Sequence, residues 1–429
     1  MFVRVAPFLP LFFASTALAQ SAPPVSPSQP TCAAYIVIDL KSNRVLGAKN
    51  PDLRLFPAST TKMMTALVAA QRGNLNQIVV ASPRAAGTGE SGIGLLSGEN
   101  HALGQLLRAV MIRSANDGSV AVAEGVAGSE ASFVRLMNEK ARALGLKNTR
   151  FQNPHGLHNP QHFTTARDLS QIGRAYCEVP FLNEIARERS ATINGNWKIG
   201  PTRTFPNTNK LLLRWPLADG LKTGYTRQAG NCLVATATKT LPNGQRWRLL
   251  SVVLKSRRGH SFSDSRLILE RAFSQYAPHQ IARAGEDVWS GKIKGGAKIL
   301  EAGAAKGIEL PLRAGEIASL QREIEIFDIA APVKRGQLVG RAHFSANGRR
   351  IASLGLQARE EVPETLLSRA APAIGHSVSF WPTSWRIGFW GVLSGVFASV
   401  LLFFKLRKRR RKPFRAATLG RENLTKHSL

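Results

Sequence analysis

A serine and a lysine three residues apart, Ser59 and Lys62, are the side chains in this sequence best placed to do chemistry. Pro57 cannot continue a helix backwards and Ser59 is a residue type that favours a helix N-terminus, so a helix is expected to begin at Ser59. On a helix this spacing puts the hydroxyl and the amine on one face, one turn apart. A lysine amine that is partly desolvated near another cation has a lowered pKa and can activate a serine nucleophile as its base. The Ser59–Lys62 pair alone is weak evidence for this chemistry, because a capped amphipathic helix can carry the same pattern by chance.

Two later motifs strengthen this interpretation. Ser114-x-Asn116 lies in a turn between two apolar-periodic helices, and Lys222-Thr223-Gly224 lies in a strand pattern. Ser-x-x-Lys, Ser-x-Asn and Lys-Thr-Gly, in this order, are the motifs of serine acyl-enzymes such as penicillin-binding proteins and β-lactamases. Three motifs in one chain, each in a suitable local context, make a strong signal.

From about Ala33 to Pro363 the chain resembles a low-molecular-mass penicillin-binding protein of the D-alanyl-D-alanine carboxypeptidase family. The resemblance implies an α/β (α+β) transpeptidase fold of the penicillin-binding-protein/β-lactamase type, with no cofactor and no metal. It rests on the three motifs and on these stretches: Leu55-Phe56-Pro57-Ala58-Ser59, Asn153-Pro154-His155-Gly156-Leu157, Asn207 to Leu212, Asp219 to Thr226, and Ala331 to Gln337.

The resemblance also implies what the first two motifs do. Ser59 would attack the carbonyl between two D-alanines, and Lys62 would take its proton. Ser114 would relay a proton to the leaving amine, and Asn116 would hold the substrate amide. The substrate would be a peptidoglycan pentapeptide stem, and β-lactam antibiotics would act as inhibitors.

The third motif is expected to bind the end of the substrate. Lys222 and Thr223 would bind its terminal carboxylate, with Lys222 also keeping the site positive so that the catalytic lysine can be neutral. Gly224 lets the substrate backbone approach the strand edge, and the backbone amides of Ser59 and Tyr225 would form the oxyanion hole. In one departure, some relatives carry an arginine for the carboxylate where this chain has Thr208.

Length and charge bound the remaining possibilities. The chain has 429 residues, 44% of them hydrophobic, which allows two or three domains with proper cores. Its formal net charge is +31, and the segment 405–429 holds ten basic residues and one acidic residue. A body this basic favours anionic surroundings such as phospholipid or an acidic cell-wall polymer. Nucleic acid is the competing partner for a basic protein, and the signals for export described in the next paragraph argue against it.

Both ends of the chain carry membrane-related signals. Residues 1–19, with Arg4, an apolar run and a small-x-small cleavage site, form a predicted secretory signal peptide. Residues 387–404 contain no charge and are just long enough for a transmembrane helix, and the basic run that follows predicts a cytoplasmic tail over 405–429. The sequence therefore predicts a single-pass protein of the inner (cytoplasmic) membrane. The helix and the basic tail would contact the lipid bilayer, and the catalytic domain would lie in the periplasm or at the cell exterior.

Between these ends we expect a Pro/Ser-rich linker over 20–31, a catalytic domain over 32–277, a small β-sandwich-like domain over 278–364 and a connector over 365–386. In the catalytic domain, strand patterns at both ends with helices between them predict a sheet covered by a helical cluster. The three cysteines are too few for a disulfide framework, and Cys232, in an apolar strand pattern, is expected to be a buried small hydrophobe.

Other chemistries fit less well. His155, His158 and His162 have ligand-like spacing, but Pro154, Gly156 and Pro160 prevent a helix that could align them on a metal. No Gly-x-Ser-x-Gly elbow supports an esterase triad, and a β-lactamase would be expected to hold a deacylating glutamate that Asn153 to Leu157 does not contain.

Two alternatives remain open. An endopeptidase of the same fold, cutting D-Ala cross-links, would share all three motifs. A non-catalytic sensor of β-lactams or cell wall would need a signalling domain, and the predicted cytoplasmic tail is too short for one.

Overall fold

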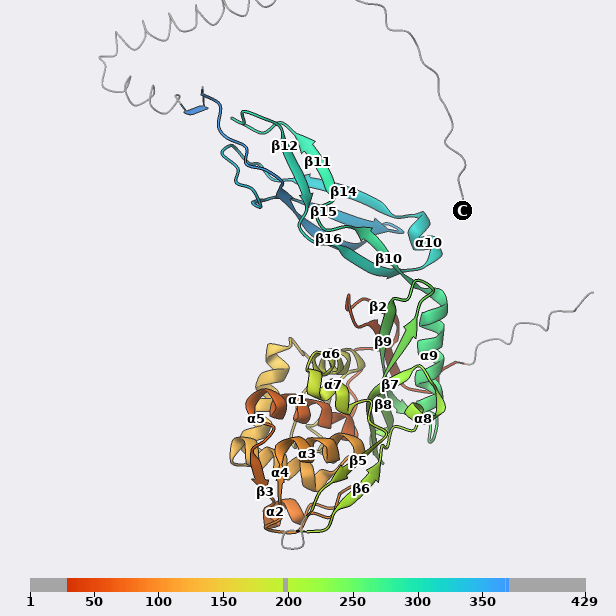
Figure 1. Ribbon diagram of the computed structural model, residues 1–429. Helices are drawn as coiled ribbons and strands as arrows, with labels where there is room; N and C mark the ends of the chain where they lie inside the picture. The colour runs from red at the N-terminus through yellow and green to blue at the C-terminus, as the bar shows by residue number, and fades with distance from the viewer. Residues whose placement is uncertain (1–28, 196–199, 367, 370–429) are drawn as a thin grey trace, which may run out of the picture. The chain divides into compact units, whose positions relative to one another are not determined.

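The computed structural model describes residues 29–195, 200–366 and 368–369, which form two compact units (Figure 1). The first unit holds the described residues up to Ile281 together with Glu309–Ala318, and the second holds Ala282–Ile308 and the described residues from Ser319 onward. The predicted signal peptide, transmembrane helix and basic tail lie outside the described residues. Within the described residues, no helix is long and apolar enough to cross a membrane.

The first unit is built on a five-stranded antiparallel sheet in the order β2-β1-β9-β8-β7. Side chains in these strands alternate between two apolar cores, as the two-residue period of a strand requires. In β8, for example, Val234 belongs to one core while Leu233 and Ala235 belong to the other. The strands are β1 (Ala34–Asp39), β2 (Val45–Lys49), β7 (Ala218–Thr226), β8 (Gly230–Thr240) and β9 (Arg246–Ser256).

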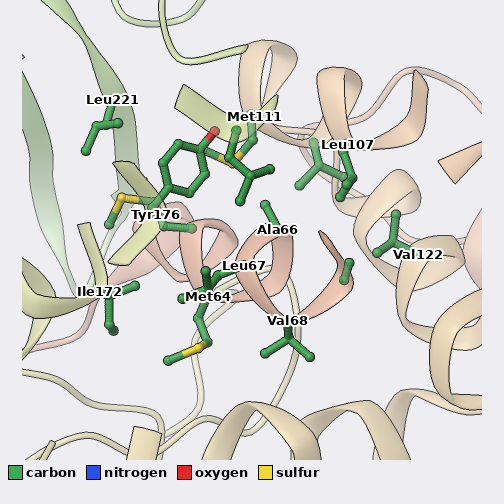
Figure 2. Packing of buried hydrophobic residues seen from close by; sticks show 14 of the residues in the cluster. Met64, Ala66, Leu67, Val68, Leu107, Met111, Val122, Ile172, Tyr176 and Leu221 are labelled. Carbon is green, nitrogen blue, oxygen red and sulfur yellow. The ribbon is translucent and has the colours of Figure 1, made fainter. Parts of the chain in front are cut away.

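Helices cover both faces of this sheet, with α9 and the short helix α8 on one side and a helical cluster on the other (Figure 1). Helix α1 is the centre of the cluster, and its residues from Lys62 to Ala69 are all buried. Figure 2 shows Met64, Leu67 and Val68 of α1 pointing into the surrounding core. A helix that is apolar nearly all round must be enclosed by other elements, so α1 is held in place from every side. The helices are α1 (Lys62–Arg72), α2 (Pro83–Ala86), α3 (Leu103–Arg108), α4 (Asn116–Ala127), α5 (Glu130–Ala143), α6 (Ala166–Cys177), α7 (Pro180–Ile185), α8 (Leu211–Arg214) and α9 (Ser261–Gln275).

Short two-stranded pairs complete the first unit. Strand β3 (Ile78–Val80) pairs with β4 (Asn100–Ala102), and β5 (Ser190–Ile193) pairs with β6 (Arg203–Pro206). Strand β10 (Ala277–Ala282) pairs with β13 (Ile308–Leu312), where the chain returns to the first unit before α10 (Ala314–Ala318).

The second unit is built around a five-stranded antiparallel sheet in the order β11-β12-β16-β15-β14. Its strands are β11 (Asp287–Gly291), β12 (Leu300–Ala304), β14 (Gln321–Ile326), β15 (Leu338–Ala346) and β16 (Arg349–Ala358). The buried side chains of Ala342, Phe344, Leu354 and Leu356 belong to its two longest strands, β15 and β16. Apart from helical residues at 366 and 368–369, the described part of this unit is all-β, as the short strand patterns beyond Pro278 predict.

Candidate active site

Ser59 and Lys62 lie at the start of the central helix, but not on a regular helical turn. The chain enters through a 3-10 turn, Ala58–Thr61, and the α-helix begins only at Lys62. Neither element has a side-chain cap hydrogen bond, so the prediction of a helix beginning at Ser59 is wrong in its detail. A 3-10 turn places residues i and i+3 nearly in line, and Lys62 Nζ lies 3.0 Å from Ser59 Oγ.

Ser114 and Asn116 reach the site through a second irregular turn. Helix α3 continues as a π turn, Ala109–Arg113, and Ser114 then takes a left-handed conformation with φ of 70° before α4 begins at Asn116. The apolar-periodic helix expected before the Ser114 turn is thus two pieces, and the second is wider than an α-helix. Lys62 Nζ donates to Asn116 Oδ1 at 2.7 Å, so this turn brings the second motif against the first. Irregular π turns of this kind are frequent at functional sites.

The third motif lies on β7, the edge strand of the sheet. The Lys222 ammonium is buried and donates to the backbone oxygen of Thr223 at 3.1 Å, and Thr223 Oγ1 donates to Thr208 Oγ1 at 2.9 Å. A Cβ atom on Gly224 would lie 3.0 Å from the Pro57 oxygen and from the Ser59 nitrogen. Glycine therefore lets this strand edge approach the turn that carries Ser59.

Burial changes the pKa of both lysines. Lys62 is fully buried, and its pKa lies well below the usual value, first because of desolvation and then because of the charge of Lys222. The carboxylates of Asp117 and Glu90 oppose this shift. Burial also lowers the pKa of Lys222, from 10.5 to about 7. Burial and the charge of Lys222 thus both favour the form of the Lys62 amine that lacks a proton.

A cavity of about 350 Å³ opens beside these groups, a size that suits the end of a short peptide. Its lining includes Ser59, Ser114, Asn116, Thr223, Gly224 and Tyr225. The structure thus gathers the eight predicted site residues in one place, six of them at the cavity and the two lysines buried beside it. Thr208, which stands where some relatives carry an arginine, also lines the cavity.

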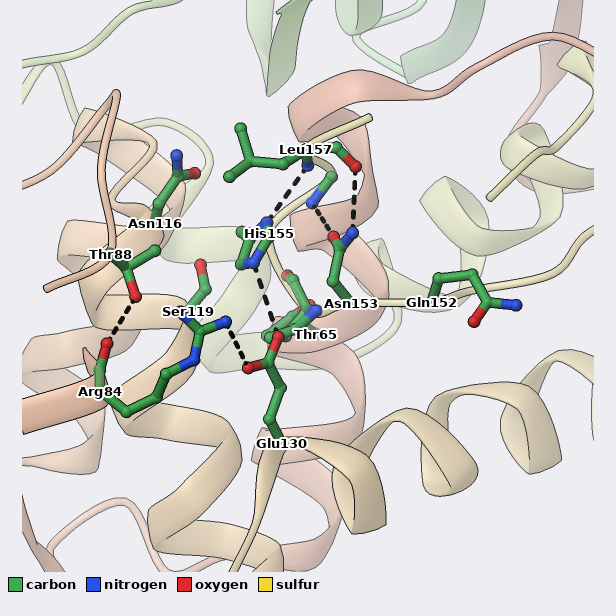
Figure 3. A network of polar contacts seen from close by, with 12 residues as sticks. Thr65, Arg84, Thr88, Asn116, Ser119, Glu130, Gln152, Asn153, His155 and Leu157 are labelled. Atoms are coloured by element: carbon green, nitrogen blue, oxygen red, sulfur yellow. Dashed lines mark hydrogen bonds and ion pairs between the residues drawn. The ribbon is translucent and has the colours of Figure 1, made fainter. Parts of the chain in front are cut away.

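A polar network that the sequence did not predict holds the loop that contacts Lys62, and Figure 3 shows its side chains Arg84, Glu130 and His155. The backbone oxygen of His155 accepts from Lys62 Nζ at 2.7 Å. The His155 ring lies between the backbone nitrogen of Leu157, 3.2 Å from Nδ1, and Glu130 Oε1, 3.6 Å from Nε2. Arg84 donates to the other Glu130 oxygen at 3.0 Å. Because Nδ1 accepts, Nε2 carries the proton and points to the carboxylate, which fixes the ring and the oxygen that Lys62 uses.

The loop that carries His155 also packs directly against the nucleophile turn. Gly156 has φ of 91°, and a Cβ atom there would lie 2.0 Å from the backbone oxygen of Ala58. Only glycine allows both this conformation and this approach. His155 and its neighbours left no signal in the sequence beyond the Asn153 to Leu157 stretch, because Arg84 and Glu130 come from α2 and α5, far apart in the chain.

The three histidines of this loop do not point to a metal. His162 is buried against Thr61, with Nε2 lying 3.0 Å from Thr61 Oγ1, and burial lowers its pKa to about 3. Among the residues that the structure describes, no group of three or more His, Cys, Asp or Glu side chains is arranged to hold a metal ion. The three cysteines are free, and Cys232 is buried, as predicted.

Comparisons with known proteins agree with this geometry over both units. A family model described as D-alanyl-D-alanine carboxypeptidase matches residues 19–258, and one described as the C-terminal domain of penicillin-binding protein 5 matches residues 276–364. The crystal structure of penicillin binding protein 5 from Haemophilus influenzae is similar, with a TM-score of 0.69 and 32% identity, and the match covers 79% of this chain and 100% of that chain.

Two curated relatives carry different activities in their names. D-alanyl-D-alanine carboxypeptidase DacC of Escherichia coli (strain K12) is 35% identical over 371 residues, which is 82% of this chain and 89% of that protein. D-alanyl-D-alanine endopeptidase of the same strain is 35% identical over 235 residues, which is 52% of this chain and 73% of that protein. The similarity to DacC covers 371 residues and so extends well beyond residues 19–258, which the carboxypeptidase family model matches.

Proposed function

Because the chain belongs to the D-alanyl-D-alanine carboxypeptidase family of serine peptidases, we propose that it removes the terminal D-alanine from peptidoglycan pentapeptide stems through an acyl-enzyme on Ser59. The observation that carries this proposal is the position of the Lys62 amine, buried and 3.0 Å from Ser59 Oγ. A buried amine at this distance from a hydroxyl has the geometry of a base and its nucleophile.

The surroundings of Lys62 favour the neutral amine as the base. A neutral amine has two N–H groups and one lone pair. Two carbonyl oxygens, Asn116 Oδ1 and the backbone oxygen of His155, each lie 2.7 Å from Nζ and take the two N–H groups. The lone pair is then left for the third neighbour, the Ser59 hydroxyl, whose proton it accepts.

Acylation follows from this arrangement. Ser59 Oγ forms a bond to the carbonyl carbon between the two D-alanines as its proton passes to Lys62. The negative charge that develops on the carbonyl oxygen is stabilised by the backbone amides of Ser59 and Tyr225. The bond to the leaving nitrogen then breaks, and the proton reaches that nitrogen through the Ser114 hydroxyl, so D-alanine leaves as an amine. Water later hydrolyses the ester and returns the enzyme.

The terminal carboxylate is bound at the β7 edge. Thr223 donates its hydroxyl proton to Thr208, so the hydroxyl proton of Thr208 is free to point into the cavity that both residues line. A chain of two hydroxyl groups next to the Lys222 ammonium offers the carboxylate donors without an arginine. The absence of an arginine at position 208 is thus compatible with carboxylate recognition.

The same groups account for acylation by β-lactams. A β-lactam presents an amide and a carboxylate in the arrangement of D-Ala–D-Ala, and its ring keeps the leaving nitrogen attached after the amide bond breaks. Ser59 would therefore form a penicilloyl ester.

Anchoring in the inner membrane is a further part of the proposal. Residues 387–404 carry no charge and are followed by a strongly basic run, which by the positive-inside rule lies in the cytoplasm. The catalytic unit would then face the periplasm or the cell exterior, next to its cell-wall substrate.

The endopeptidase alternative is tested together with the carboxypeptidase. The full-length chain is incubated with a pentapeptide that ends in D-Ala–D-Ala and, separately, with a cross-linked peptide dimer, and Ser59→Ala serves as the control. Release of D-alanine from the pentapeptide alone supports the proposal. Cleavage of the dimer with no release from the pentapeptide would show an endopeptidase, and reaction with neither would favour a non-catalytic wall-binding protein.

A further inference from the structure

One acidic side chain, Glu90, stands out at the mouth of the active site. Among the described residues that line the cavity, Glu90 is the only acid, and no lysine or arginine lines it. The other lining groups are hydroxyl, amide, apolar or aromatic side chains and backbone. The Glu90 carboxylate is exposed in a protein with a formal net charge of +31, whose field attracts anions and repels cations. A single carboxylate in this position offers a local site for a positive charge.

The backbone around Glu90 is hydrogen-bonded to Asn116 of the active site. Glu90 takes φ of 66°, an uncommon conformation for a residue with a long side chain. Its two neighbours hold it there. Asn116 Nδ2 donates to the backbone oxygen of Gly89 at 3.0 Å, and the Asn116 backbone nitrogen donates to the backbone oxygen of Ser91 at 2.7 Å. Glu90 is therefore held beside the residue expected to bind the substrate amide.

The chain after Glu90 is tied down as well. The buried Asp117 carboxylate accepts from the backbone nitrogens of Ile93 and Leu95, and a Cβ atom on Gly92 would lie 2.9 Å from it. This loop is thus attached at both Asn116 and Asp117, directly after the Ser114 turn. The backbone position from which the Glu90 side chain extends is therefore held in place, which is what a specificity group requires.

We propose that Glu90 selects substrates by binding a positively charged amine on the side chain of the residue that precedes D-Ala–D-Ala. The inference rests on the proposed function, because it uses the same bound orientation. The terminal carboxylate lies at the Lys222 and Thr223 side, and the acyl part of the substrate lies along the Asn116 side, where Glu90 is. The substrate class is then a stem peptide whose side-chain amine is free, rather than one in which that amine is acylated.

The test compares two tripeptides that differ only at this amine. Acetyl-L-Lys-D-Ala-D-Ala with a free side-chain amine and the same peptide with that amine acetylated are given to the full-length chain, and kcat/KM for D-alanine release is measured. We expect Glu90→Gln to lower kcat/KM about fivefold for the free amine, the upper range for an exposed ion pair, and to leave the acetylated peptide unchanged. Glu139→Gln, which removes an exposed carboxylate on α5, is the matched control and should change neither.

Charge reversal gives a second readout. Glu90→Lys should reverse the preference, so that acetyl-L-Glu-D-Ala-D-Ala becomes a better substrate than the free-amine peptide. Acylation by a β-lactam without a cationic group, at the rate of the wild type, shows that the variant site is intact.

Two results would overturn the inference in distinguishable ways. If wild type releases D-alanine from both peptides and Glu90→Gln changes both rates by the same factor, Glu90 acts only through its charge at Lys62 and the specificity role is wrong. If wild type releases D-alanine from neither peptide, the proposed function fails and this inference fails with it.

Discussion

Replacing Lys222 by methionine should make the protein more stable while it loses activity. The substitution keeps an unbranched side chain, one heavy atom shorter, and removes the amine. Burial lowers the pKa of Lys222 from 10.5 to about 7, so the folded state disfavours the ammonium relative to the unfolded chain. At about 1.4 kcal/mol for each pH unit, this difference corresponds to a destabilisation of about 5 kcal/mol when the amine is protonated in both states.

The pH dependence identifies the cause. Between about pH 7 and pH 10.5 the unfolded chain binds a proton that folded Lys222 does not, so the free energy of unfolding rises with pH in this window. Below this window both states bind the proton and the whole penalty is present. The free energy of unfolding of Lys222→Met should therefore exceed that of wild type by up to about 5 kcal/mol at pH 6 and by about 2 kcal/mol at pH 9.

Urea denaturation of the full-length chain at both pH values, followed by near-UV circular dichroism, measures the difference. Lys210→Met is the matched control, because Lys210 is exposed, and its effect should stay within about 0.5 kcal/mol at either pH. D-alanine release should be lost in Lys222→Met and kept in the control. A stability gain of the same size at pH 6 and pH 9, or a loss at pH 6, would refute the assignment of a buried, destabilising ammonium at Lys222.

Three further substitutions test the contacts that position Ser59 and Lys62 and the side of the membrane on which the C-terminal end lies. Gly156→Ala places a Cβ atom 2.0 Å from the Ala58 oxygen. This overpacking should destabilise the protein by about 1–3 kcal/mol and slow the acylation of Ser59 by β-lactam. Normal acylation would show that the loop does not position the nucleophile. Glu130→Gln should slow acylation about tenfold, since the ring of His155 loses its charged partner, whereas Glu139→Gln should not. The pKa of Glu130 is lowered first by its hydrogen bond with His155, so the stability advantage of wild type over Glu130→Gln should be present above pH 4.5 and fade below it; a constant difference in urea denaturation would contradict this. A cysteine at Ser428 should resist a membrane-impermeant thiol reagent in intact cells, and labelling above the background of the native cysteines would show that its end of the chain is not cytoplasmic.

The fold and the family were largely predictable because both depend on local patterns. Apolar strand patterns identified the strands that form the sheet, and the three motifs identified the family. The predicted serine DD-carboxypeptidase class and the α+β fold with a C-terminal all-β domain are confirmed. The exact domain boundaries, the signal peptide and the roles of the site residues stay predictions.

The features that the sequence did not predict depend on contacts between distant segments. The 3-10 turn at Ala58–Thr61 and the π turn at Ala109–Arg113 are imposed by the packing around Ser59 and Ser114, whereas local propensity favours a regular helix. The His155–Glu130–Arg84 network needs side chains from α2 and α5, which both pack against α4, to meet in space. Helix α6 is different, because Thr165 caps it and its apolar residues have helical spacing, so a signal was present and was missed.

Covalent modification of Ser59 is the most direct test of the central claim. The full-length wild-type chain and Ser59→Ala are incubated with benzylpenicillin, and intact mass spectrometry followed by peptide mapping locates any adduct. We predict that wild type gains the mass of one β-lactam on the peptide that contains Ser59, that Ser59→Ala gains none, and that Lys62→Ala, with its nucleophile intact and its base removed, is acylated far more slowly. An adduct that persists in Ser59→Ala, or a Lys62→Ala variant that is acylated at the wild-type rate, would contradict the account.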